Sequence, residues 1–178
     1  MKKLDPRQLF AQISLLESNV LRFSVLREES VVDLVVDYAA EALSDWFEAR
    51  ARGVTREEYA APPRDFRRLV FWGVSALRFR PGPRWREPVF SWDGLRRVLR
   101  QHPPAITFAE VTGSEGAFCA EFEFETWGLV SFTFEGICVN RRMGTGAGDG
   151  GDDSSAYVDV ETGEPFDFHE PFAEDIVM

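Results

Sequence analysis

The stretch "AFCAEFEFETWGLVSFTF" at residues 117–134 constrains the fold more than any other part of the chain. Apolar side chains occupy every second position on both sides of a turn at residues 126–128. A period of two is that of a β-strand with one buried face, so the stretch predicts an antiparallel hairpin. If Phe124 pairs with Val130, the apolar residues share one face and no glutamate lies opposite another glutamate. The predicted buried face consists of Phe118, Ala120, Phe122, Phe124, Val130, Phe132 and Phe134.

A second hairpin is predicted over residues 20–37, because apolar residues alternate with polar ones on both sides of "REES". The two apolar sets fall on the same face if Leu26 pairs with Val31. A competing interpretation makes residues 31–38 the start of a helix capped at Ser30. We favour strand to residue 37, followed by a helix over residues 39–52.

Two short helices are predicted from their caps. In the first, Asp5 precedes Pro6, a residue suited to the first helical position. In the second, Ser91 caps an apolar stripe and a proline pair at 103–104 stops it. Between them, residues 66–79 are expected to form two short strands, or one bulged strand kinked at Gly73. A further strand and turn are predicted at residues 155–166, followed by a tail that packs by Phe166, Phe168 and Phe172.

Together these elements predict an α+β fold, mainly antiparallel β-sheet built from hairpins, with a few short helices packed on one face. With 178 residues, the chain is expected to form a single domain over residues 1–178. No stretch approaches the roughly 18 apolar residues of a membrane span, so no membrane partner is expected. The lysines at positions 2 and 3 lack the apolar segment of a signal peptide, which favours a cytoplasmic location.

The net charge of −10 is distributed unevenly along the chain. Residues 1–100 carry 18 basic and 14 acidic side chains, whereas residues 101–178 carry 2 and 16. Within the first part, residues 64–100 hold ten arginines interleaved with aromatic residues. We expect the basic centre and the acidic third to pair, either inside one fold or between two copies as a homodimer.

The glycine-rich segment "GTGAGDGGDDSS" at residues 144–155 contains the pattern G-x-G-x-x-G. A phosphate cradle requires a helix after the glycines, but "AYVDV" follows here as a strand. Asp149, Asp152 and Asp153 would moreover repel a phosphate, although they make the loop a weak candidate for a cation. The segment is therefore predicted to be a flexible loop between strands.

Metal and nucleophile chemistry have little support in the residues present. Asp167 and His169 are a weak metal candidate, because His102 is the only other histidine and lies far away in the sequence. Cys119 and Cys138 match no zinc spacing and have no basic neighbours that would activate a thiol. We expect no metal and no cofactor.

Two surfaces remain as candidate binding sites. The first is an acidic row of Glu121, Glu123, Glu125 and Glu135, and the second is the segment "RWR" formed by Arg84, Trp85 and Arg86. Size and charge favour a small bacterial non-enzymatic protein that acts by protein–protein contact, by analogy with immunity-type or regulatory partners. One alternative is a metal- or carboxylate-dependent hydrolase. The other is a binder of single-stranded nucleic acid through residues 64–100, against which the acidic pI of about 4.7 argues.

Overall fold

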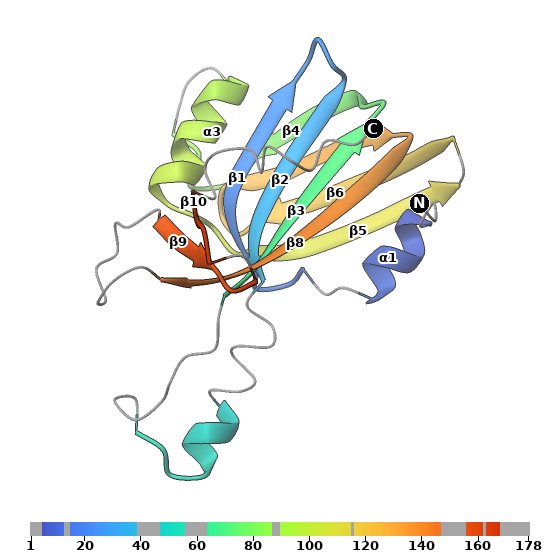
Figure 1. Ribbon diagram of the computed structural model, residues 1–178. Helices are drawn as coiled ribbons and strands as arrows, with labels where there is room; N and C mark the ends of the chain where they lie inside the picture. Colours follow the sequence, from blue (N-terminus) through green and yellow to red (C-terminus); the bar gives the residue numbers. More distant parts are fainter. Residues whose placement is uncertain are drawn as a thin grey trace.

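The computed structural model describes residues 5–12, 15–38, 47–55, 64–86, 90–114, 116–146, 156–161 and 163–167. These residues form two antiparallel sheets with short helices, which confirms the predicted α+β class (Figure 1). In the six-stranded sheet the order is β1 (Asn19–Leu26), β2 (Val31–Tyr38), β3 (Arg64–Trp72), β8 (Gly136–Gly146), β9 (Ala156–Asp159) and β10 (Pro165–Asp167). In the four-stranded sheet the order is β4 (Ser75–Pro81), β7 (Gly128–Phe134), β6 (Ala117–Phe124) and β5 (Ile106–Ser114).

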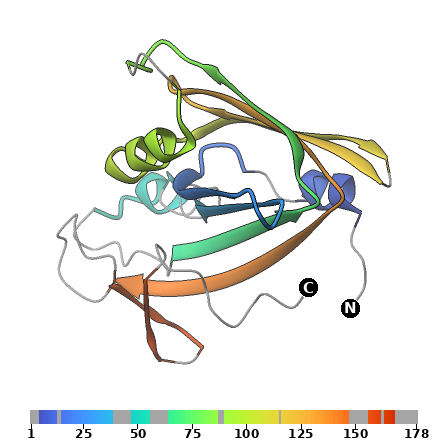
Figure 2. The same cartoon turned by 90° about the horizontal axis from the view of Figure 1, so that it is seen from above.

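A sharply bent pair of antiparallel chain segments joins the two sheets. Trp72 of β3 pairs with Gly136 of β8, and Ser75 of β4 pairs with Thr133 of β7 in the same register. Strands β3 and β4 are therefore one chain segment paired along its length with β7 and β8, and Figure 2 shows both segments curving from one sheet into the other. The predicted kink at Gly73 is confirmed: its φ is +64°, a conformation that glycine adopts without steric strain.

The sheets also meet at their other side. Asn19 at the start of β1 forms a β-bridge with Ala105, and the Ile106 amide donates to the Ser18 carbonyl at 2.9 Å. The β1–β2 hairpin itself has the predicted register, with Leu26 opposite Val31. Residues 31–38 are accordingly strand and not the start of a helix.

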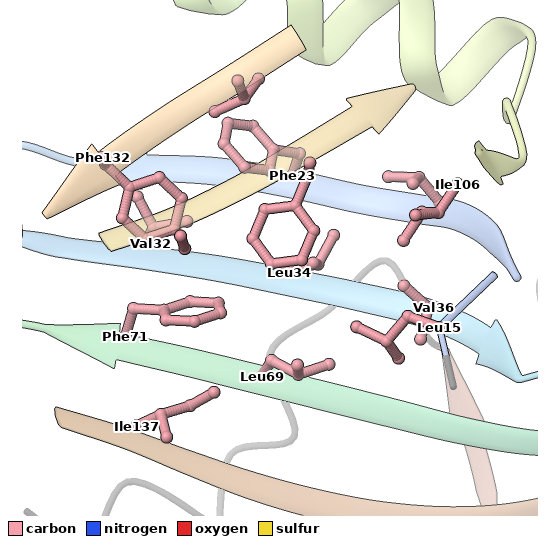
Figure 3. Close-up of a cluster of buried hydrophobic side chains, with 14 of the residues drawn as sticks. Leu15, Phe23, Val32, Leu34, Val36, Leu69, Phe71, Ile106, Phe132 and Ile137 are labelled. Carbon is pink, nitrogen blue, oxygen red and sulfur yellow. The ribbon is translucent and has the colours of Figure 1, made fainter. Parts of the chain in front are cut away.

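The core fills the space between the facing sides of the two sheets (Figure 3). Phe71 of β3 is fully buried at its centre, with its ring edge-on to Phe132 and Phe134 at 5.0 Å and to Phe122 at 5.9 Å. Edge-to-face pairs at this spacing add to the free energy gained from burial alone. All seven apolar residues predicted to share the inner face of the 117–134 hairpin are buried in this core.

Both helices with assigned bounds pack on the inner side of the four-stranded sheet (Figure 2). Helix α1 (Pro6–Gln12) begins after Asp5, whose carboxylate accepts from the Arg7 amide at 2.9 Å. Helix α3 (Trp92–Gln101) begins after Ser91, whose hydroxyl accepts from the Gly94 amide at 3.0 Å, as predicted. Because the helices occupy the inner side, the opposite side of this sheet carries no helix among the described residues.

The predicted register of the β6–β7 hairpin is wrong by two residues. Phe124 pairs with Gly128 and Phe122 with Val130, so the turn spans residues 125–127 alone. This tight turn forms because Glu125 adopts a φ of +43° and the Trp127 amide donates to the Phe124 carbonyl at 2.8 Å. A shift by two preserves which residues face the core, but it changes their cross-strand neighbours.

Strand β8 extends into the segment that the glycine pattern predicted to be a loop. Gly144 pairs with Asp159 and Gly146 with Tyr157, so residues 144–146 belong to a paired strand. Residues 147–155 lie outside the described part of the chain, as do residues 39–46 of the predicted helix and the tail from residue 168. Residues 47–51 are helical, in agreement with the prediction for that part.

Candidate protein-binding face

The exposed side of the four-stranded sheet is the candidate site, and we call it the outer face. Its members follow from the pleat, since residues that alternate with the buried phenylalanines point away from the core. Ser131 lies between buried Val130 and Phe132, and its cross-strand neighbours Arg78 and Glu121 share its side of the sheet. The outer face comprises Ser75, Arg78, Arg80, Phe108, Glu110, Thr112, Cys119, Glu121, Glu123, Leu129, Ser131 and Thr133.

Charge on the outer face changes sign from one edge to the other. The pairing places Arg78, Ser131, Glu121 and Glu110 in one row across the four strands. The next row consists of Arg80, Leu129, Glu123 and Phe108. The two arginines thus lie on edge strand β4, whereas the three glutamates lie on β6 and on the opposite edge strand β5.

Two carboxylates face each other directly on this surface. Glu110 of β5 is the cross-strand partner of Glu121 of β6, an arrangement that destabilises a sheet. Next to them, the Thr107 hydroxyl donates to the Glu123 carboxylate at 3.1 Å. The acidic half of the outer face therefore holds uncompensated negative charge.

The negative charge of the outer face acts on the thiol of Cys119. Its thiol is half-buried on β6, one row from Glu121. Burial raises the pKa of Cys119, and the carboxylates of Glu121 and Glu110 raise it further because they oppose a thiolate. This thiol is therefore held in its neutral form and is not an activated nucleophile.

The structure separates the four glutamates of the predicted acidic row. Glu121 and Glu123 share the outer face, but Glu125 lies in the β6–β7 turn and Glu135 at the bend beside Gly73. The outer face instead gains Glu110, which the sequence did not single out. The sequence pattern that would place Glu110 on this face is weak, because a bulge between Ile106 and Phe108 interrupts the alternation of inward and outward side chains in β5.

The predicted "RWR" segment follows β4 and leads back toward the core. Trp85 is half-buried, with its ring edge-on to Phe79 at 5.2 Å and tilted against Phe90 at 5.6 Å. Arg84 and Arg86 on either side are exposed. Trp85 therefore packs against other aromatic rings on the side of the core.

Two arginines of the basic centre, Arg67 and Arg68, form ion pairs with buried carboxylates. Arg68 of β3 and Arg22 of β1 contact the buried carboxylate of Asp33 at 3.0 Å and 2.7 Å. Burial lowers the pKa of Arg22, whereas Asp33 opposes that effect. A second carboxylate, that of Asp65, forms ion pairs with Arg67 at 2.7 Å and with Arg141 at 2.9 Å. Arg67 and Arg68 thus contact Asp65 and Asp33, carboxylates that lie outside the acidic residues 101–178. Arg141, which lies within residues 101–178, also contacts Asp65.

The metal candidates are not assembled by the described residues. Asp167 ends β10, whereas Asp149, Asp152, Asp153 and His169 lie outside the described part of the chain. Among the residues that are placed, no group of three His, Cys, Asp or Glu side chains could hold a metal ion. His102 lies beside Trp127, with the ring centroids 6.3 Å apart and the ring planes nearly parallel.

Two open hollows flank Trp92, one between the β1–β2 turn and the start of α3 and the other between that turn and the start of β4. The larger, of about 500 Å³, is lined by residues that include Arg27, Glu28 and Ser91. Ser91 is already engaged as the cap of α3, so its hydroxyl is committed to the helix. The outer face remains the larger assembly of exposed charged groups.

No family model matches this chain, and neither a curated protein nor a solved structure matches it. In the described residues, no helix has the length and apolar character needed to cross a membrane. Function is therefore inferred from the geometry and charge of the outer face.

Proposed function

We propose that the protein acts by protein–protein contact through the acidic half of the outer face. The observation that carries the proposal is the direct juxtaposition of Glu110 and Glu121, with Glu123 in the adjacent row. The partner is a protein with a basic surface, and the role is that of a neutralising or regulatory partner. The chain's net charge of −10 favours long-range attraction of such a partner.

A cationic partner would relieve an unfavourable feature of the free protein. Two carboxylates on neighbouring strands repel each other, and a guanidinium placed between them removes that repulsion on binding. Charges at the rim of an interface act chiefly on the association rate and on the choice of partner. We therefore expect fast, salt-sensitive association.

The test is capture of a partner from the source cells with purified, immobilised protein. Three proteins are compared: the natural chain, the double variant Glu110→Lys/Glu121→Lys, and the matched control Glu28→Lys/Glu29→Lys in the β1–β2 turn. Both variants change the net charge equally, but only the first alters the outer face. A protein retained by the natural chain and the control, and lost by the outer-face variant, supports the proposal.

The association kinetics of the captured protein then refine the result. The outer-face variant is expected to associate about tenfold or more slowly at low salt, with a weaker dependence on salt concentration. If all three proteins capture the same set with equal rates, the outer face is not the binding surface.

A further inference from the structure

The outer face carries both signs of charge, arranged so that two copies complement each other. In the row Arg78–Ser131–Glu121–Glu110 the basic end lies on β4 and the acidic end on β5. Arg78 and Glu110 are both exposed, and neither forms an ion pair with any described residue. Adjacent strands are about 4.8 Å apart, so these two charges are separated by about 14 Å within one copy, too far to pair.

We propose that a second copy of this chain docks on the outer face, related by a two-fold axis parallel to the strands. The inference goes beyond the proposed function, because it assigns a second occupant to the same surface. With the axis between β7 and β6, strand β4 of the second copy lies over β5 of the first. Arg78 of the second copy then lies over Glu110, and symmetry repeats the pair at the other edge.

The charge pattern selects this axis over the alternative. A two-fold axis across the strands would place β4 over β4 and β5 over β5. Arginine would then face arginine and glutamate would face glutamate, and such juxtaposition of like charges disfavours that arrangement. Aligned sheets pack at about −30°, and the long arginine side chains accommodate that angle.

The second row supports the same arrangement. Phe108, at 38% exposure, is the large hydrophobic residue left most open on the outer face. The parallel axis brings Arg80 of the second copy over the Phe108 ring, a cation–π contact in which the arginine stem also covers apolar surface. Phe108 is thus buried by the second copy, whereas the described residues of one copy leave it exposed.

The size of the outer face predicts a weak dimer. Four strands of about seven residues span about 19 by 24 Å, or on the order of 450 Å² for each copy. This is below the roughly 800 Å² that each partner contributes to a standard interface, so the dimer is expected to be concentration-dependent. Because the dimer and a foreign basic partner use the same glutamates, they exclude each other.

Sedimentation equilibrium over a wide range of protein concentration tests the inference. The natural chain should dimerise, whereas Arg78→Glu alone and Glu110→Arg alone should each raise the dimer dissociation constant by about tenfold or more. In an equimolar mixture of these two variants, both contacts between position 78 of one copy and position 110 of the other again join opposite charges. The mixture should therefore dimerise, as should the double variant Arg78→Glu/Glu110→Arg.

The charge-reversal controls are Arg27→Glu and Glu28→Arg, at exposed positions in the β1–β2 turn. Both variants should dimerise like the natural chain. Thermal melting establishes that each variant is folded. A natural chain that stays monomeric, single variants that dimerise unchanged, or a mixture that stays monomeric would each overturn the inference. The capture experiment separates the two ideas, since retention of a foreign protein that depends on Glu110 and Glu121 survives the loss of the dimer.

Discussion

Glu110 on β5 lies directly opposite Glu121 on β6, so two carboxylates of like charge are cross-strand neighbours on an exposed sheet face. Replacing Glu110 with Gln removes the repulsion and leaves the shape of the side chain unchanged. We expect the free energy of unfolding to rise by about 0.2–1 kcal/mol at low salt. Urea unfolding at low protein concentration measures the change, and added salt should diminish it.

The matched control for this prediction is Glu28→Gln in the β1–β2 turn, where no cross-strand carboxylate is present among the described residues. A Glu110→Gln protein that is no more stable than this control at low salt would show that the repulsion is already compensated.

Asp33 is only 1% exposed and forms an ion pair with Arg68, which is itself 2% exposed. Asp33→Asn leaves guanidinium charge buried without its carboxylate, and we expect a loss of about 3–5 kcal/mol in unfolding free energy. The double variant Asp33→Asn/Arg68→Met should recover part of that loss, because one buried charge is removed with its partner. Denaturant unfolding measures both, with exposed Glu29→Gln as control. If the losses of the single variants Asp33→Asn and Arg68→Met simply added in the double variant, Asp33 and Arg68 would not be energetically coupled.

Alkylation of Cys119 reports the electrostatic potential of the outer face. Only the thiolate reacts, and its fraction at a given pH is small because burial and the two carboxylates raise the thiol pKa. In a Cys138→Ser background, Glu121→Gln lowers that pKa and shifts the rate–pH profile toward lower pH. Glu110→Gln should act in the same direction with a smaller effect. Glu135→Gln, at the bend, is the control that should leave the iodoacetamide profile unchanged; an equal shift in all three would point to net charge alone.

The bend between the sheets depends on Gly136, whose backbone lies against the Trp72 ring. A Cβ there would overlap the indole, so Gly136→Ala should lower the unfolding free energy by about 1–3 kcal/mol or more. Replacing the indole by a smaller side chain with Trp72→Leu should recover part of the lost unfolding free energy. Gly116→Ala is the contrast, because its φ of +91° is strained for alanine but its Cβ would meet open space. Thermal melting of the four variants distinguishes the two causes, and rescue of Gly116→Ala by Trp72→Leu would contradict this account.

Local sequence signals predicted the elements whose partners are close in the chain. The cap at Ser91 and the Leu26–Val31 register depend on neighbouring residues, and both are present as expected. The faces of β6 and β7 were predicted for the same reason. Their register was not, because the left-handed backbone at Glu125 allows a shorter turn than the pattern suggests.

The candidate site could be predicted only in part, since it depends on pairings between distant residues. Glu121 and Glu123 were identifiable from alternation along one strand. Glu110 and Arg78 were not, because bulges at residues 106–108 and 75–78 break the period of two in β5 and β4. Which strands belong to which sheet is likewise a non-local property that no short pattern encodes.

The bent pair of segments 64–81 and 128–146 makes the rate of folding a property of both sheets together. Residues 64–81 must find residues 128–146 before the six-stranded sheet has its central pair β3–β8 and before edge strand β4 can pair with β7, so folding requires the closure of a large loop. Such non-local pairing is slow, and neither sheet can serve as an independently folding unit. Amide protons of β2 and β6, in different sheets, should therefore exchange through the same global opening.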